Sequence, residues 1–187
     1  MLWIGFLILS TTRLSAQELA FKDISLQEVS TGEEIKISQY GSSQVVVVIF
    51  FCNGCPYSTF YINRIKGLTS DYASVQFILI NSNSSEFVPS ESESNMAKLK
   101  SDEGFRIPYL ADKSQIAKNA LGAKKCPEAF IILPKDNWKV MYSGAIDDNP
   151  QVASDVKEKY LKKALDQVLE SSNLETAYQR PTGCVIK

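Results

Sequence analysis

The sequence predicts a three-layer α/β sandwich whose central mixed sheet has a parallel centre, an antiparallel edge and an N-terminal β-hairpin extension. Residues 44–51 form a continuous, β-branched apolar run, which is typical of a strand buried on both faces of a sheet. Helical spacing over 57–68 and a second apolar run over 75–80 follow it. These three segments make a βαβ pattern, the basic unit of a parallel sheet.

The remaining elements follow from local patterns. Residues 21–37 alternate apolar and polar side chains about a turn signal at 30–33, which predicts the hairpin. Further helices are predicted over 96–103, 114–121 and 153–169. Further short strands are predicted at 109–110, 130–133 and 140–142. We expect Gly122 to close the helix before it, and Asp147 and Asp148 to cap the helix that follows them.

The chain is predicted to have three parts. Residues 1–16 hold an apolar run that is too short to span a membrane and end in Ser15 and Ala16, which predicts a signal peptide cleaved after Ala16. A hydrophobic helix that stays attached is the alternative. Residues 17–172 are expected to form one domain, and residues 173–187 a tail docked on it. Export, to the bacterial periplasm, places the cysteines where disulfides persist.

The composition excludes several classes of function. With 20 basic and 21 acidic residues, the net charge of −1 argues against sequence-independent electrostatic binding to nucleic acid or to an anionic membrane. There is no histidine, which removes Ser-His-Asp and Cys-His catalysis and HExxH zinc chemistry. A chain of 187 residues can fold without a disulfide framework, so its four cysteines are available for chemistry.

Cys52 and Cys55 form a CxxC motif where the buried strand gives way to a helix. A thiol at a helix start lies near unpaired backbone N–H groups and the positive end of the helix dipole, which favour the reactive thiolate. We therefore expect Cys52 to attack and Cys55, in the same first turn, to resolve the mixed disulfide. Gly54 keeps the approach open, and Pro56 suits an early helical position. An inert local disulfide and a metal site are the alternatives.

Pro127, directly before a buried strand, is the second feature of the site, because proline accepts a cis peptide bond at low cost. With the CxxC motif, it makes the chain resemble the thioredoxin superfamily, and most closely the bacterial peroxiredoxin-like, redoxin-domain proteins of AhpC/TSA type. Five segments carry this resemblance: 50–57 (FFCNGCPY), 80–83 (INSN), 108–112 (PYLAD), 144–148 (GAIDD) and 183–187 (GCVIK).

The resemblance implies a thioredoxin-like fold with Cys52 as the nucleophile, Cys55 as the resolving thiol and Pro127 as the cis-proline. The substrate groove would be lined by Asn53, Gly54, Cys126 and Pro127. Three positions depart from the pattern. Cys126 stands before the cis-proline, where the family usually has threonine or another small or β-branched residue. Val46 stands where thioredoxin has a buried aspartate that moves protons. Another residue or water must therefore accept the proton of Cys55. Ile49 stands three residues before Cys52, where peroxiredoxins carry a hydroxyl, so the local sequence gives a peroxidase no support.

The other two cysteines leave alternatives open. If Pro127 is cis and faces the CxxC motif, Cys126 must lie near Cys52. Cys126 is then either a small buried apolar side chain or a third thiol, able to form an alternative disulfide or to help hold a metal. Cys184 either anchors the docked tail or returns to the site as a possible third thiol that exchanges disulfides with Cys52.

These observations predict a thiol–disulfide oxidoreductase that needs no bound organic cofactor. Its substrate would be a protein or small-molecule thiol or disulfide, and a separate redox partner would recycle it. Three alternatives remain: an all-cysteine metal-binding or metal-delivery module, a peroxiredoxin-like peroxidase, and a catalytically idle adaptor of the same fold. The uncharged pair Asn53-Gly54 does not indicate whether the protein acts as a reductant or an oxidant.

Overall fold

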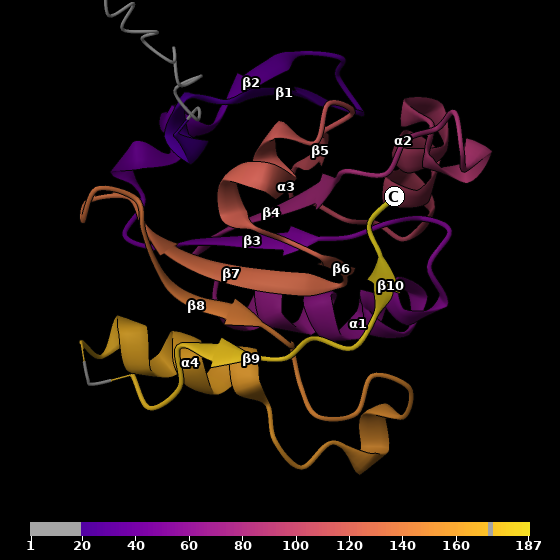
Figure 1. Ribbon diagram of the computed structural model, residues 1–187. Helices are drawn as coiled ribbons and strands as arrows, with labels where there is room; N and C mark the ends of the chain where they lie inside the picture. Colours follow the sequence, from indigo (N-terminus) through magenta and orange to yellow (C-terminus); the bar gives the residue numbers. More distant parts are fainter. Residues whose placement is uncertain (1–19, 172–173) are drawn as a thin grey trace, which may run out of the picture.

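The computed structural model describes residues 20–171 and 174–187 (Figure 1). In this part of the chain the main sheet has the strand order β2-β1-β5-β4-β3-β7-β8-β9. Its strands are β1 (Ser25–Glu28), β2 (Glu34–Lys36), β3 (Val46–Phe50), β4 (Gln76–Asn81), β5 (Tyr109–Ala111), β7 (Glu128–Leu133), β8 (Lys139–Gly144) and β9 (Tyr178–Gln179). A second sheet pairs β6 (Lys125–Cys126) with β10 (Cys184–Val185). The predicted signal peptide, residues 1–16, lies outside the described residues.

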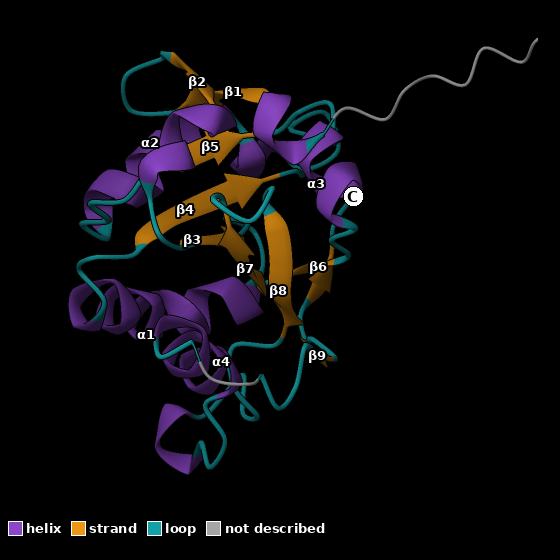
Figure 2. Ribbon diagram, turned by 90° about the vertical axis from the view of Figure 1, so that its left-hand side faces the viewer, coloured by secondary structure: helices purple, strands orange, loops and turns teal. Residues whose placement is uncertain are grey.

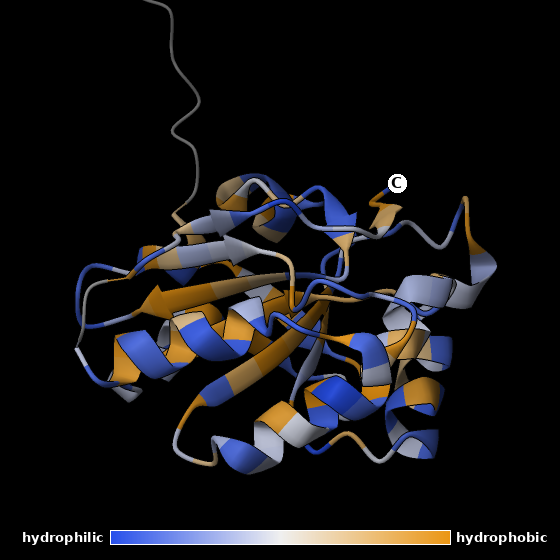
Figure 3. Cartoon of the chain, turned by 90° about the horizontal axis from the view of Figure 1, so that it is seen from below, coloured by the Kyte–Doolittle hydropathy of each residue, from blue (hydrophilic) through white to orange (hydrophobic). Residues whose placement is uncertain are grey.

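Strand β3 lies at the centre of the sheet, and all of its residues are buried. It pairs in parallel with β4 and antiparallel with β7, so the predicted mixed sheet is confirmed. Because alternate residues of a strand point to opposite faces, Val47 and Ile49 pack into one core cluster, whereas Val48 and Phe50 pack into the other. Figure 3 shows the apolar residues concentrated on these central strands, with the helices polar on their outer sides.

The helices form the outer layers on both faces of the sheet (Figure 2). They are α1 (Pro56–Asp71), α2 (Glu93–Asp102), α3 (Ile116–Leu121) and α4 (Tyr160–Leu169). Residues of α1, α2 and α4 pack into one core cluster, and residues of α3 pack into the other. Gly122 ends α3 in the left-handed conformation, with φ of 71°, as its place in the sequence predicts.

The N-terminal hairpin of β1 and β2 is antiparallel and extends the main sheet by pairing with β5. Glu28, at the end of β1, is buried and holds this junction together. Its carboxylate accepts hydrogen bonds from Lys100 Nζ at 2.6 Å and from the backbone N–H of Ser30 at 2.8 Å and of Tyr109 at 3.3 Å. One carboxylate thus links the hairpin turn, α2 and β5.

The helix predicted over 153–169 is shorter than the sequence pattern suggests. Residues Ala153–Asp155 form a separate 3-10 turn, Val156 is extended, and α4 begins only at Tyr160. Asp148 explains the break, because its carboxylate accepts the backbone N–H of Lys157 at 3.0 Å, and its own N–H donates to the Glu158 carbonyl. These two hydrogen bonds hold the chain away from a helical path.

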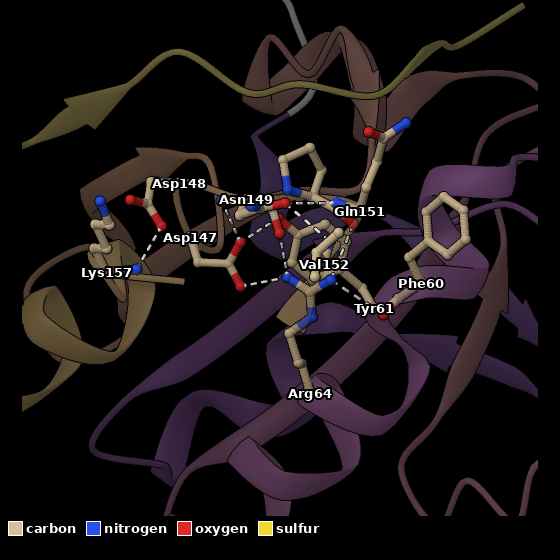
Figure 4. A network of polar contacts seen from close by, with 10 residues as sticks. Phe60, Tyr61, Arg64, Asp147, Asp148, Asn149, Gln151, Val152 and Lys157 are labelled. Atoms are coloured by element: carbon tan, nitrogen blue, oxygen red, sulfur yellow. Dashed lines mark hydrogen bonds and ion pairs between the residues drawn. The ribbon is translucent and has the colours of Figure 1, made fainter. Parts of the chain in front are cut away.

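Asp147 and Asp148 do not cap α4, whose N-cap residue is Lys159. Asp147 instead accepts the hydroxyl of Tyr61 at 2.6 Å and forms an ion pair with Arg64 at 2.7 Å (Figure 4). Arg64 also donates to backbone carbonyls of residues 149 and 150. These contacts anchor the segment after β8 to α1, so the two aspartates have a structural role that differs from the predicted one.

The C-terminal segment returns along β6 to the segment that follows β4. Strand β9 pairs in parallel with β8, and β10 pairs antiparallel with β6 (Figure 1). Ile186 is 5% exposed and joins the core cluster on the α3 face. The backbone N–H of Lys187 donates to Asn83 Oδ1 at 2.7 Å. Within the described residues, no helix is both long and apolar enough to cross a membrane.

Candidate redox site

The four cysteines gather where β3 ends, on the α3 face of the sheet. The alternation along β3 places Cys52 on the same face as Val48 and Phe50, and Cys126 and Cys184 reach it from β6 and β10. Cys55 and Cys184 form a disulfide, whereas Cys52 and Cys126 are buried thiols. The site therefore contains one oxidised and one reduced cysteine pair.

Cys52 does not occupy the helix start that we expected for it. The N-cap residue of α1 is Cys55, followed by Pro56 in the first turn, and Cys52 precedes both across a tight turn. Its link to the helix is Ser58, whose Oγ accepts the Cys52 N–H at 3.3 Å and lies 3.7 Å from Cys52 Sγ. A hydroxyl of the first helical turn thus faces this sulfur.

Glu91 holds the two residues between Cys52 and Cys55. This side chain is 4% exposed, and its carboxylate accepts the backbone N–H groups of Asn53 at 2.8 Å and of Gly54 at 2.7 Å. Asn81 Nδ2 donates to the same carboxylate at 2.6 Å. Hydrogen bonds to an ionised acceptor are roughly twice as strong as neutral ones. The CxxC loop is therefore fixed by a charged group that lies far from it in the sequence.

The Glu91 carboxylate leaves no room for a side chain at position 54. We had expected glycine there to keep the approach to Cys52 open. A Cβ at position 54 would lie 2.9 Å from Glu91 Oε1 and 2.8 Å from Ser90 Oγ. Asn53 uses its side chain to hold the loop, donating to the Ser90 carbonyl at 3.1 Å and accepting the Tyr109 hydroxyl at 2.9 Å. Both residues lie beside Cys52, and their described contacts position the loop.

Tyr109 lies under the CxxC loop and is fully buried. Burial, followed by the negative charge of Glu91, raises its pKa well above the ordinary value, so the hydroxyl stays protonated. It can therefore donate to Asn53 Oδ1 over the whole physiological pH range. This residue belongs to the 108–112 segment of the sequence, but nothing in that segment alone indicates a contact with residues 52–55.

Cys126 and Pro127 lie at the end of β6 and are joined by a cis peptide bond. The Cys126 side chain has no exposed surface. Burial is the largest cause that raises the pKa of its thiol well above the ordinary value, and a hydrogen bond with Cys52 is the next. The negative charges of Glu91 and Glu128 act in the same direction. The structure thus places Cys126 in the same buried cluster as Cys52 and keeps it a neutral thiol.

The tail carries Cys184 to the site, but its sulfur bonds to Cys55 and not to Cys52. Cys184 lies opposite Cys126 in the β10·β6 pair, and the Cα atoms of Cys55 and Cys184 are 6.0 Å apart. Gly183 makes the close approach possible, since a Cβ there would lie 2.3 Å from the Cys126 carbonyl oxygen. The local CxxC disulfide that the motif suggests is therefore replaced by one that fastens the tail.

An all-cysteine metal site is not supported by this arrangement. Within residues 20–171 and 174–187, no group of three or more Cys, Asp or Glu side chains is placed to hold a metal ion. Two of the four sulfurs are bonded to each other, so only Cys52 and Cys126 retain thiols. Because both are almost completely buried, a partner molecule reaches Cys52 only after local opening of the site.

The fold and the clustered cysteines define a redoxin with a thioredoxin-like architecture. The AhpC/TSA family matches residues 18–141, and the chain belongs to this family. Among curated proteins, no sequence matches the chain.

Among solved structures, an uncharacterized conserved protein from Geobacillus kaustophilus is 31% identical with a TM-score of 0.80, and 87% of each chain is covered. A secreted Mycobacterium tuberculosis disulfide oxidoreductase homologous to E. coli DsbE is 12% identical with a TM-score of 0.54, covering 64% of this chain and 81% of that one. The bacterioferritin comigratory protein of Xanthomonas campestris is 16% identical with a TM-score of 0.53, covering 71% and 85%. The last two similarities establish the fold alone.

Proposed function

We propose that the protein is a thiol–disulfide oxidoreductase that exchanges disulfides with a protein or small-molecule thiol, with Cys52 as the attacking sulfur. The observation that carries this proposal is the cluster of four cysteines at the end of β3, in which one pair is oxidised and the other is reduced. A purely structural disulfide would require two cysteines there and not four. Membership of a redox family supports the same chemistry.

Cys52 is the better nucleophile of the two thiols. Its sulfur faces the Ser58 hydroxyl, which can donate to a thiolate, whereas burial and the surrounding negative charge oppose ionisation of Cys126. Since the thiolate is the reactive form, attack by Cys52 is favoured. Cys55, which the motif assigns as the resolving thiol, can serve in that role only when its bond to Cys184 is open.

A peroxidase finds less support at this site. The residue three positions before Cys52 is Ile49, a buried apolar side chain of β3 that packs on the opposite face of the sheet. It offers no hydroxyl to hold a peroxide. We therefore place the oxidoreductase first.

We further propose that the protein is exported to the bacterial periplasm and is recycled there by a separate redox partner. The apolar segment before Ala16 and the Cys55–Cys184 disulfide support this location, because disulfides persist in oxidising compartments. The DsbE homologue that shares the fold is described as secreted.

The proposal is tested by measuring disulfide exchange in both directions, as reduction of insulin by dithiothreitol and as oxidation of reduced, unfolded ribonuclease. We expect the wild-type protein to accelerate one of the two reactions, and Cys52→Ser to lower that rate to background. Ser70→Ala, at the opposite end of α1 and exposed, is the matched control and should keep the wild-type rate. A wild-type protein no faster than Cys52→Ser in both reactions would exclude the proposed activity.

A further inference from the structure

We propose that Cys126 resolves mixed disulfides formed on Cys52, so that the working pair of this site is Cys52–Cys126 and not the CxxC pair. The inference rests on the proposed function, because it assumes that Cys52 first bonds to a partner sulfur. It assigns to Cys126 a catalytic role that the CxxC motif assigns to Cys55.

Cys126 has a free thiol, whereas Cys55 does not. Cys55 is bonded to Cys184 and has no thiol with which to resolve a mixed disulfide. Cys126 is the one other free thiol of the chain, and it is buried in the same core cluster as Cys52. The two thiols therefore lie in one buried cluster before any partner arrives.

The backbone that carries Cys126 is held firmly by its neighbours. Cys126 belongs to β6, which is held on one side by β10 and on the other by Glu128. The Glu128 carboxylate, 4% exposed, accepts the backbone N–H groups of Lys124 at 2.7 Å and of Lys125 at 2.9 Å. The Cys126 carbonyl oxygen lies 3.3 Å from Cys55 Sγ. The thiol is thus presented to Cys52 from a fixed backbone.

The Cys55–Cys184 disulfide contributes to this rigidity, because it clamps β10 onto β6 directly opposite Cys126. This gives the second cysteine pair a role in the same reaction: it positions the resolving thiol and is not itself consumed. The chain therefore uses its two cysteine pairs for different purposes.

The exchange balances without a further reactant. The Cys52 thiolate attacks one sulfur of a partner disulfide, the partner's S–S bond breaks, and the leaving thiolate takes up a proton. Cys126 then gives up its proton and attacks Cys52 Sγ, which forms the Cys52–Cys126 disulfide and releases the second partner sulfur as a thiol. Two electrons pass from the two cysteines to the partner, and the reverse sequence oxidises a dithiol partner.

The test uses the full chain with Cys55–Cys184 intact, equilibrated in glutathione buffers of increasing oxidised fraction. The samples are quenched in acid, alkylated and mapped as non-reduced peptides by mass spectrometry. We expect the wild type to yield a Cys52–Cys126 peptide pair beside the Cys55–Cys184 pair. In Cys126→Ser we expect glutathione to remain bound to Cys52, increased at least about tenfold in buffers near 1 mM, because a thiol in the same cluster acts at an effective concentration on the order of 10 mM or more.

Two further variants keep the result interpretable. Cys126→Ala replaces the buried thiol with a small apolar side chain and should accumulate the same glutathione adduct if the serine variant fails to fold. The double variant Cys55→Ser/Cys184→Ser should still form Cys52–Cys126.

A Cys52–Cys55 disulfide with Cys184 released in the wild type would overturn the inference, and so would equal glutathione adducts in the wild type and both Cys126 variants. Either result leaves Cys52 as the attacking sulfur. Complete absence of Cys52 adducts and Cys52 disulfides in every variant would overturn the proposed function together with this inference.

Discussion

Replacing Cys184 with serine tests how the tail is held on the domain. The disulfide joins residues separated by 129 positions in the sequence. Closing a loop of that length removes unfolded-state entropy equivalent to about 5 kcal/mol, which sets the upper limit of the loss. The backbone contacts of β10 with β6, the burial of Ile186 and the Lys187–Asn83 hydrogen bond remain in the variant. We expect the free energy of unfolding to fall by about 2–5 kcal/mol.

The measurement is equilibrium urea unfolding of the wild type and Cys184→Ser, each with and without a reductant. The wild type in reductant should match the variant, and reductant should leave the variant unchanged. Equal free energies of unfolding for the two proteins without reductant would contradict this prediction, because the Cys55–Cys184 bond would then contribute nothing to stability. A wild type that does not respond to reductant would refute it as well.

Three further substitutions test the carboxylates that organise the fold and the site. Gly54→Ala places a Cβ against Glu91 and Ser90 and should destabilise the protein by about 1–3 kcal/mol, read from thermal unfolding; unchanged stability would contradict the close contact. Glu91→Gln weakens the hydrogen bonds that this side chain accepts from the CxxC loop. It should lower the free energy of unfolding by about 1–3 kcal/mol and slow disulfide exchange. An unaltered exchange rate would show that the loop is fixed by other contacts. Burial opposes ionisation of Glu28, but hydrogen bonds led by that from Lys100 outweigh it and lower the pKa of Glu28. The stability that Glu28 contributes is therefore present above its pKa in the unfolded chain and is lost as pH falls through its pKa in the folded protein. The difference in free energy of unfolding between wild type and Glu28→Gln should narrow in acid. A constant difference from neutral to acidic pH would be inconsistent with this shift.

Much of the fold could be predicted from the sequence because its signals are local. The apolar run around β3 and the turn signal of the hairpin each depend on a few neighbouring residues, and both elements form where they were expected. The predicted helix over 153–169 shows the limit of this approach. Its apolar spacing is correct for α4, but the break before Tyr160 depends on hydrogen bonds from Asp148, which lies outside the helical pattern.

The candidate site was predicted less completely, for the same physical reason. The CxxC motif and Pro127 are recognisable as short patterns, and the structure brings them together. The Cys55–Cys184 bond depends on where the tail returns, and a sequence pattern does not encode the pairing of four cysteines. Glu91 lies in a loop of serines and glutamates whose composition suggests only a solvated surface, yet its side chain is buried against residues 53 and 54.

The most direct test of the account is to identify which sulfur first bonds to a partner. The native chain, with Cys55–Cys184 intact, is mixed with a substoichiometric amount of a peptide disulfide, quenched in acid at short times and mapped by mass spectrometry. We expect the earliest mixed disulfide to be on Cys52, which faces Ser58, and Cys126 to carry none. A first bond on Cys126, or no mixed disulfide on either thiol, would contradict this expectation.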